Sequence, residues 1–367
     1  MSTPPVRVRY PAALLPRGAA PAWSAGAAPS FAQPGWGAQA VPRRADPAGL
    51  QTLAGETMGT TWSVRLSNPG FAPLEPVRQA IVQALALVVR QMSHWEAGSD
   101  LSRFNRAPAG TRQALPAEFA EVLACALHWA RESGGAWDPT VAPLVDLWGF
   151  GPRPAGQPRA CRVPGAAALA RARLRVGHAR LAFDPARREA VQPGAMRLDL
   201  SGIAKGYAVD LVAERLRGLG HADFLVEVGG ELRACGSRPG GQPWRVAVAQ
   251  PRPAGAHAEP PPRALALRDM AVATSGDLWH GFEQDGRHYS HTIDPRTGEP
   301  VAHGLCSVTV LHPQCMQADA LATVLTVLGP REGLAFARDR GMAALLAWRA
   351  PQGIEEAMTP AFAGLAQ

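Results

Sequence analysis

The segment RLDLSGIAKGYAVDL, residues 197–211, constrains the fold more than any other stretch of the chain. Alternating apolar residues predict a strand over 196–200, and the pattern that follows predicts a helix over about 202–217. Lys205 is the single lysine beside 36 arginines, and it falls in the first turn of this helix. Because a helix N-terminus with a nearby ammonium attracts phosphate, the junction is a candidate anion site. An ordinary junction with a solvated lysine is the alternative.

The residues around the junction favour a ligand. Ser201 is expected to cap the helix, and Gly202 and Gly206 keep its entry free of side chains. Asp199, at the end of the strand, is placed to accept a hydrogen bond from a ligand. The segment is not a P-loop, because G-x-x-x-x-G-K-[ST] is absent.

The remaining strand and helix patterns come in mixed order. Strands are predicted at 60–67, 222–228, 244–249, 306–311 and 343–348. Helices are predicted at 75–95, 116–133, 317–328 and from Pro330 to near Gly341. Without strict βαβ alternation, we expect an α+β fold in which mixed or antiparallel sheets pack with helices.

The ordered part of the chain is expected to span residues 51–350, and its length allows one to three domains. Residues 1–50 are expected to be a disordered, Pro/Ala-rich basic tail, and 351–367 a C-terminal tail. Residues 151–195 are expected to be a loop-rich insertion around a short helix and a hairpin, and 251–263 a Pro-rich surface connection.

The basic charge is confined to two stretches. Residues 1–50 carry +4 and residues 151–195 carry +7, so the rest of the chain carries −4 against a total of +7. This distribution argues against a folded nucleic-acid groove, and no nucleic-acid partner is expected. A binding protein that acts through its basic tail remains an alternative.

Two further bulk features bear on the compartment. The five cysteines are odd in number and contain no C-x-x-C, so free thiols are expected. No apolar run reaches about 18 residues, so no transmembrane segment is expected.

A second candidate constellation is Asp319 and Thr323 in QADALATVLTVLG. Four residues apart on a predicted helix, they face the same way. A carboxylate and a hydroxyl are hard oxygen ligands suited to Mg²⁺, which needs few protein ligands when a phosphate supplies others. The alternative is a helix start with a favourable Asp and a buried threonine.

A third constellation is HYSHTIDPRTGEPV, residues 288–301, where DPRTG reads as a tight turn. His291 and Asp294 flank Ile293, which could press on a flat ring. A histidine-based zinc site is a further alternative in this histidine-rich half.

Two more segments offer aromatic surfaces. In GGAWDPTVAPLVDLWGFG the Ala136-Trp137-Asp138 turn could wrap a heterocycle. Met58 and Trp95 are soft and flat surfaces suited to an aromatic ligand. Plain core packing is the alternative for each.

Together these segments resemble the ApbE family, the FAD:protein FMN transferases. The matching pieces, spread over roughly residues 55–329, are ETMGTTW, DLSRFN, WDPTVAPLVDLWGFG, DLSGIAKGYAVD, ATSGD, YSHTIDPRTGEPV and ADALATVLTVLG. Several are long and uncommon, so the combination is specific where one motif would not be.

The resemblance implies a T-fold-like α+β architecture, with one compact catalytic domain over residues 51–350. It also implies an enzyme that uses Mg²⁺ and takes FAD as its substrate. FMN would pass from FAD to a Thr or Ser hydroxyl in the flavinylation motif of a respiratory or redox flavoprotein, and AMP would leave. Carried over by position, the FAD contacts are Met58, Trp95, Ala136, Trp137, Asp138, Asp199, Lys205 and Ile293. The metal ligands are the carbonyl of Gly202 and the side chains of Asp319 and Thr323. His291 matches the histidine near the reacting phosphoryl group, and its role as general base is a hypothesis.

The chain departs from the family in small ways. Trp95 stands where many relatives have tyrosine, and Trp137 where many have phenylalanine. Many relatives are exported, whereas no signal peptide is legible here, so we expect a cytoplasmic location, with the periplasmic face of the inner membrane as the alternative. An FAD pyrophosphatase that yields FMN and AMP, and a non-catalytic FAD-binding protein, are the competing functions.

Overall fold

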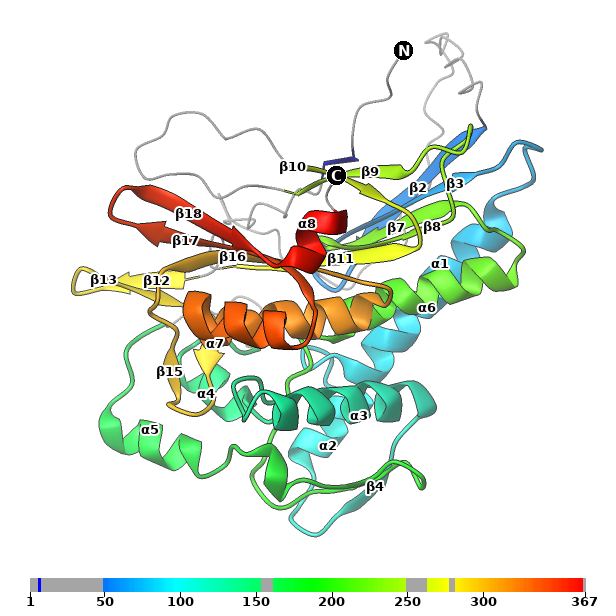
Figure 1. The fold of residues 1–367 in the computed structure, drawn as a ribbon. Helices are drawn as coiled ribbons and strands as arrows, with labels where there is room; N and C mark the ends of the chain where they lie inside the picture. The colour runs from blue at the N-terminus through cyan, green and yellow to red at the C-terminus, as the bar shows by residue number, and fades with distance from the viewer. Residues whose placement is uncertain (1–5, 8–48, 153–160, 249–262, 277–280, 366–367) are drawn as a thin grey trace, which may run out of the picture.

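An eight-stranded antiparallel sheet forms the upper layer of the protein in Figure 1. The structure is a computed structural model that describes residues 6–7, 49–152, 161–248, 263–276 and 281–365. In spatial order the strands are β18 (Gly353–Met358), β17 (Ala343–Ala350), β16 (Leu305–His312), β11 (Met270–Ser275), β8 (Glu231–Cys235), β7 (Phe224–Val228), β3 (Thr60–Ser67) and β2 (Leu50–Thr57).

Alternating side chains of the sheet enter two different cores. In β7, Phe224 and Val226 face the helices, whereas Leu225 faces the other side, where β9 (Trp244–Val248) and β10 (Arg263–Leu267) cover the sheet. Successive side chains of a strand point to opposite faces, so a strand covered on both sides is apolar throughout.

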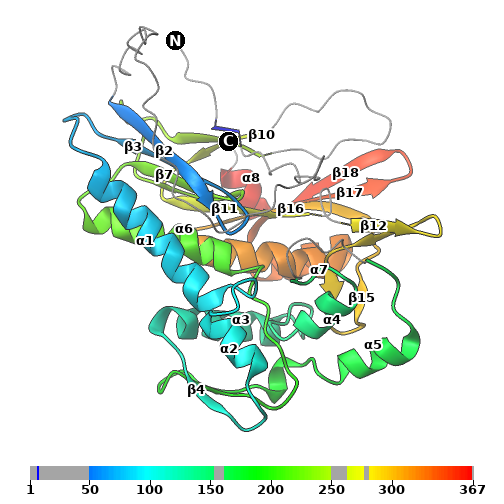
Figure 2. The same cartoon turned by 180° about the vertical axis from the view of Figure 1, so that it is seen from behind.

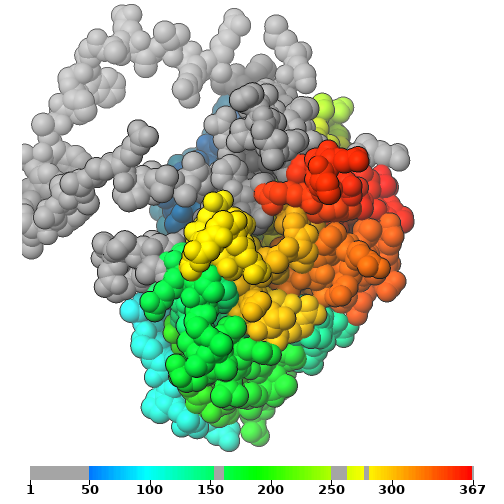
Figure 3. Space-filling model, turned by 90° about the vertical axis from the view of Figure 1, so that its left-hand side faces the viewer, coloured from blue at the N-terminus to red at the C-terminus, as the bar shows by residue number. Residues whose placement is uncertain are grey.

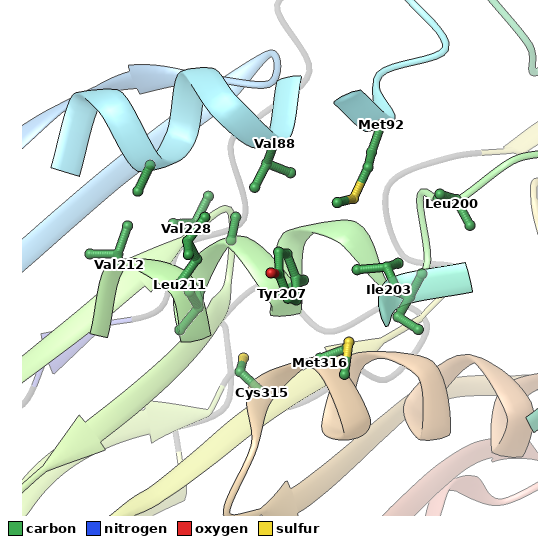
Figure 4. Close-up of a cluster of buried hydrophobic side chains, with 14 of the residues drawn as sticks. Val88, Met92, Leu200, Ile203, Tyr207, Leu211, Val212, Val228, Cys315 and Met316 are labelled. Carbon is green, nitrogen blue, oxygen red and sulfur yellow. The ribbon is translucent and has the colours of Figure 1, made fainter. Parts of the chain in front are cut away.

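Three long helices cover the lower face of the sheet (Figures 1 and 2). They are α1 (Glu75–Met92), α6 (Ala204–Gly218) and α7 (Cys315–Asp339). Figure 4 shows α6 between the other two: Tyr207 and Ile203 lie between Met92 of α1 and Met316 of α7. The helix that carries Lys205 is therefore held on several sides.

Shorter elements form a third layer beneath these helices (Figure 1). Its helices are α2 (Asp100–Arg106), α3 (Ala117–Glu132), α4 (Ala142–Leu147), α5 (Ala166–Arg173) and the 3₁₀ turn η1 (His178–Arg180).

The small sheets of the described chain are β4 (Arg112–Ala114) with β6 (Glu189–Val191) and β5 (Ala182–Asp184), β12 (Gly281–Gln284) with β13 (Arg287–Ser290), β14 (Ile293–Asp294) with β15 (Glu299–Pro300), and β1 (Val6–Arg7) with β9 and β10. The last helix, α8 (Pro360–Leu365), packs on β17.

Most predicted elements are confirmed. The two helices predicted on either side of residue 329 form α7, which is interrupted at Gly329, where φ is 78°. That backbone conformation suits glycine, and the following Pro330 can open a helix but not continue one.

The strand predicted over 196–200 is wrong. Its side chains alternate between buried and less buried, but its strand pairing within the described residues is limited to one isolated bridge between Arg197 and Val141. The side-chain amide of Asn105 replaces the missing neighbour: Oδ1 accepts the N–H of Leu198 at 2.7 Å, and Nδ2 donates to the Leu198 carbonyl at 2.9 Å. The segment is extended chain stabilised by a side chain, which periodicity does not distinguish from a strand.

The end of the chain also differs from the prediction. Residues 353–365, expected as part of a tail, form β18 and α8, and Phe362 of α8 is fully buried. The short helix and hairpin predicted within 151–195 are α5 and the β5–β6 pair. The tail predicted for 1–50 and the connection predicted for 251–263 lie almost wholly outside the described residues.

One described helix is long and apolar enough to span a membrane by length and composition, and it is α7. Its most apolar window is 56% buried inside this fold, and its side chains fill the core beneath β11 and β16. We therefore read α7 as a core helix.

Candidate active site

Two helices approach closely at Gly206. Its backbone N–H in α6 donates a hydrogen bond of 2.9 Å to Oδ2 of Asp319 in α7. A Cβ at position 206 would lie 2.4 Å from the carbonyl oxygen of Cys315 and 2.8 Å from Cβ of Asp319, so only glycine permits this spacing. Asp319 is 3% exposed, and its carboxylate sits in the first turn of α6, where the helix dipole favours negative charge.

The expected cap of α6 is wrong. Ile203 occupies the N-cap position and makes no side-chain cap hydrogen bond. Ser201 instead turns back: its N–H donates to Oδ1 of Asp199 at 2.8 Å, and its hydroxyl donates to the same oxygen. Asp199 thus closes an Asx turn before the helix, a local hydrogen bond that competes with capping.

The start of α6 consequently offers fewer free backbone N–H groups to an anion than expected. The N–H of Ala204 donates to the Leu200 carbonyl at 2.9 Å, and that of Gly206 is taken by Asp319. The positive charge of this junction therefore comes chiefly from the ammonium of Lys205.

Lys205 pairs with a buried carboxylate that lies outside the predicted site residues. Its Nζ lies on Oε1 of Glu231, the first residue of β8, which is 3% exposed. Oε2 of Glu231 is buried and has no hydrogen-bond partner among the described residues. A buried carboxylate oxygen needs a donor or a cation, so this atom marks a place for a ligand.

The charges of this group interact. Burial and, after it, the charge of Glu231 raise the pKa of Asp319, Lys205 and the Gly206 amide lower it, and the net result is a pKa of about 7. The buried Asp319 carboxylate is therefore under-neutralised, because Lys205 is shared with Glu231. A cation bound here would relieve that shortage.

Thr323 lies one helical turn after Asp319 and faces the same junction. Its Oγ1 is 2.9 Å from the point that a Cβ on Gly202 would occupy, and 3.2 Å from the hydroxyl of Ser275. The three residues expected to bind metal are thus brought together between α6 and α7.

This donor set fits Mg²⁺. It offers one carboxylate, one hydroxyl and the backbone of Gly202, with the unpartnered Glu231 oxygen nearby, and all are hard oxygen donors. No group of three or more His, Cys, Asp and Glu residues in the described ranges could hold a metal, so these ranges give no support to a histidine-based zinc site.

The turn from Ala136 to Asp138 borders the same junction. The Trp137 indole is buried, and its Nε1 is 3.2 Å from the point that a Cβ on Gly202 would occupy. Asp138 holds the turn in place: Oδ1 accepts the N–H of Thr140 at 2.8 Å, and Oδ2 accepts the N–H of His178 at 2.7 Å and lies 3.0 Å from its Nδ1. The Asp138 carboxylate is therefore engaged within the protein, and its carbonyl accepts the N–H of Val141 at 3.2 Å.

Trp95 presents an exposed aromatic side chain near Asp199. Nδ1 of His94 lies 3.5 Å from Oδ1 of Asp199, and the His94 ring is tilted against Trp95 at 5.6 Å. Trp95 is 55% exposed. An indole that large and that exposed is suited to stack on a flat ligand.

Met58 forms the tip of the β2–β3 hairpin. Met58 and Gly59 both have positive φ, 49° and 71°, as a two-residue type I′ turn requires. A methionine there is strained, and such strain often occurs at functional sites. The hairpin reaches the junction through Thr60, since a Cβ on Gly229 would lie 2.8 Å from Thr60 and 3.5 Å from Cδ of Lys205.

His291 and Ile293 belong to a neighbouring cluster. Ile293 is buried with Trp148 and Phe150, and the His291 ring meets Phe150 edge to face at 6.4 Å. The ion pair between Arg197 and Asp146 joins this cluster to the segment that leads into α6. The structure therefore places the expected site residues in two adjoining groups.

Sequence reasoning missed four side chains of these groups: Glu231, Ser275, His94 and His178. Glu231 follows a strand and two glycines in VGGEL, and Ser275 lies in the quoted ATSGD run. Glu231 contacts Lys205 and Ser275 contacts Thr323, both far away in the chain, so local spacing does not predict either contact.

Three comparisons with known proteins agree. A profile described as the ApbE family matches residues 58–346. The chain is 38% identical over 322 residues to the FAD:protein FMN transferase of Haemophilus influenzae, a match that covers 86% of this chain and 91% of that protein. It is 37% identical over 317 residues to the FAD:protein FMN transferase of Vibrio cholerae, with 86% and 92% covered.

Solved structures share the fold. The flavinyl transferase ApbE of Pseudomonas stutzeri matches with a TM-score of 0.77 at 40% identity, covering 86% of this chain and 96% of that one. The flavin transferase ApbE of Vibrio cholerae also matches with a TM-score of 0.77, at 36% identity, covering 86% and 99%. The expected fold of helices packed with antiparallel sheet is thereby confirmed. By sequence and by structure, this chain belongs to the ApbE family.

Proposed function

We propose that this protein transfers FMN from FAD to a Thr or Ser hydroxyl of an acceptor protein and releases AMP. Relatives that align with most of the chain are named FAD:protein FMN transferase. The observation that carries the proposal is the convergence of Asp319 and Thr323 on the first turn of α6, beside Lys205. Oxygen donors next to an ammonium are what a pyrophosphate and a divalent cation require together.

The metal in this proposal is Mg²⁺, held by Asp319, Thr323 and the carbonyl of Gly202. When bound, it neutralises pyrophosphate charge and orients the scissile bond. Lys205 contributes positive charge from the protein side: its ammonium pairs with Glu231 at the start of α6, where it would offset the charge of the pyrophosphate.

The flavin ring is bound by surfaces of the protein around this junction. Trp95 offers an exposed indole, Met58 a thioether at the hairpin tip, and Ile293 an apolar edge. The Ala136–Asp138 turn brings the buried Trp137 indole beside Gly202, and the Asp138 carboxylate holds the turn in place.

The chemical step is a displacement at phosphorus. The acceptor hydroxyl oxygen attacks the FMN phosphorus, and the P–O bond to the AMP phosphate breaks. The hydroxyl proton passes to a ring nitrogen of His291, and AMP leaves as a phosphate monoester. The assignment of His291 as the base rests on its match to the family motif and on its place beside Ile293.

Two other functions use the same site differently. A pyrophosphatase would let water replace the acceptor hydroxyl and release FMN and AMP. A non-catalytic carrier would bind FAD and release neither. The paired carboxylate and hydroxyl favour a reaction over storage, because storage does not need a cation at the pyrophosphate.

Co-expression with a candidate acceptor that bears an exposed Thr/Ser flavinylation motif separates the three. Transfer predicts an acceptor whose intact mass rises by one FMN less one water, and no rise when the acceptor Thr is replaced by Val. AMP release with an unchanged acceptor mass would identify a pyrophosphatase. Neither signal, with FAD bound, would identify a carrier.

A further inference from the structure

We infer that the exposed end of α5 is a docking surface for an acidic segment of the acceptor protein. This basic face consists of Arg171, Leu174 and Arg175, in the stretch that carries +7. The inference rests on the proposed transfer to a protein and adds the chemistry of the partner.

The basic face lies next to the candidate site. On its inner side α5 packs Leu169 and Ala172 against the cluster that holds Ile293. Nη2 of Arg173 donates to the carbonyl of Arg296 at 2.9 Å, in the turn directly after Ile293 and Asp294. Figure 3 shows the α5 region, in green, on the same face of the molecule as the yellow β12–β13 hairpin that leads to His291.

The outer side of α5 has an apolar residue between unpaired cations. Leu174 is 76% exposed, which is more than any other large apolar residue that the structure describes. Arg171 and Arg175 are exposed on either side of it, and their guanidinium groups have no ion-pair or hydrogen-bond partner within the ranges that the structure describes. Arg171 lies in the last turn of α5 and Arg175 in the turn just after it, so the two like charges flank Leu174 in the chain.

Other arginines of this stretch serve the fold. Arg173 holds the 294–298 turn, Arg180 donates to the carbonyl of Leu174, and Arg187 lies 3.8 Å from Asp184. Favourable interaction with the helix dipole explains basic residues in the last turn of α5, but it does not explain an exposed leucine between them. An apolar anchor flanked by arginines is typical of protein interfaces.

The partner that fits this face is a protein segment with Asp or Glu beside an apolar side chain, close in its chain to the flavinylated hydroxyl. Attraction between exposed charges acts over about 8 Å at physiological salt, so it guides the segment to the site and acts mainly on the rate of association. A segment bound to this face would place the acceptor hydroxyl near His291, because α5 packs against the cluster that contains Ile293.

A peptide library with a fixed central Thr and random flanks tests the inference. The protein is incubated with the library, FAD and Mg²⁺, and flavin-labelled peptides are sequenced by mass spectrometry. We expect Asp and Glu to be enriched in the flanks with the wild-type protein, and the enrichment to vanish with Arg171→Glu/Arg175→Glu. For one synthesised acidic peptide, the double variant should raise KM by about tenfold with kcat nearly unchanged.

The matched control is Arg215→Glu/Arg245→Glu. These arginines are also exposed, at the end of α6 and in β9, lie outside the proposed site, and change the net charge by the same amount. The control should keep both the enrichment and the KM, and equal loss in both variants would overturn the inference as an effect of net charge. Melting temperatures of both variants should match the wild type.

The failures are distinguishable. Labelled peptides without acidic enrichment overturn the docking surface and leave the transfer standing, whereas no label on any peptide or folded acceptor overturns the transfer itself. If wild type but not Arg171→Glu/Arg175→Glu binds vesicles of phosphatidylglycerol and phosphatidylcholine, and the KM is unchanged, the face belongs to a lipid surface and the inference is wrong.

Discussion

The carboxylate of Asp319 in α7 accepts the backbone N–H of Gly206 in α6, one residue after Lys205. A proposed metal ligand thus holds the start of the helix that carries the proposed phosphate-binding cation. Because Thr323 lies against Gly202 one turn further along, two contacts fix the register of α6 against α7. The metal site and the cation site therefore cannot move independently.

Asp319→Ala should abolish the Mg²⁺ dependence of transfer. The variant loses the only carboxylate of the proposed ligand set, and we expect the transfer rate to fall by about 100-fold or more. Flavinylation of a co-expressed acceptor, followed over time by intact mass, measures the rate. Transfer at the wild-type rate would show that Asp319 does not bind the metal.

Thr326→Val is the control for that experiment. Thr326 lies on α7, is buried, and donates its hydroxyl to the Ala322 carbonyl at 2.7 Å, so it has no part in the junction. The variant should keep its response to Mg²⁺, even if its stability changes slightly.

Lys205→Arg should not be neutral. Glu231 is buried, and the Lys205 stem passes close to Gly229, so the pocket fits a slender ammonium and not a planar fork. A misplaced charged hydrogen bond should lower kcat/KM for FAD by about tenfold. Initial rates at limiting and saturating FAD, with exposed Arg215→Lys as control, measure the effect. Unchanged rates at both concentrations would exclude a specific role for the ammonium.

The order and type of many elements could be predicted, because they depend on local periodicity. TTWSVRLS alternates, and β3 buries Trp62, Val64 and Leu66 as expected. The predicted four-residue spacing of Asp319 and Thr323 also holds, because both lie on one helix. Local pattern is sufficient where one element decides the outcome.

What could not be predicted depends on partners far away in the chain. The 196–200 segment looks like a strand, yet Asn105 satisfies its backbone from a helix 93 residues away. Glu231 lies 26 residues after Lys205, and no spacing rule links a strand start to a helix start. The Asp319 cap of Gly206 replaces the local Ser201 cap for the same reason.

Glu231→Gln should move the pH dependence of Mg²⁺ binding to lower pH. The pKa of Asp319 is raised to about 7 by burial and then by the charge of Glu231. Metal affinity requires the carboxylate, so it falls as pH drops through that pKa. Without the charge of Glu231, Lys205 is left to neutralise Asp319 alone, so the pKa of Asp319 falls. The loss of Mg²⁺ affinity then occurs at lower pH. Calorimetric titration of Mg²⁺ across about pH 5 to 8 measures it. A midpoint that stays in place or rises would contradict the proposed charge interaction.

Gly206→Ala and Gly218→Ala make a matched test of the α6–α7 contact, because both glycines lie on α6. A Cβ at 206 would meet backbone atoms of Cys315 at 2.4 Å, whereas one at 218 meets nothing within 4 Å. Overpacking should lower the free energy of unfolding of Gly206→Ala by about 1–3 kcal/mol, while Gly218→Ala should raise it by about 0.5–1 kcal/mol. Urea unfolding at equal m-value measures both changes. The separation of α6 from α7 in Gly206→Ala should also weaken Mg²⁺ binding, because Asp319 and Lys205 move apart. If Gly206→Ala is as stable as Gly218→Ala, the two helices are not held at the spacing on which the metal site depends.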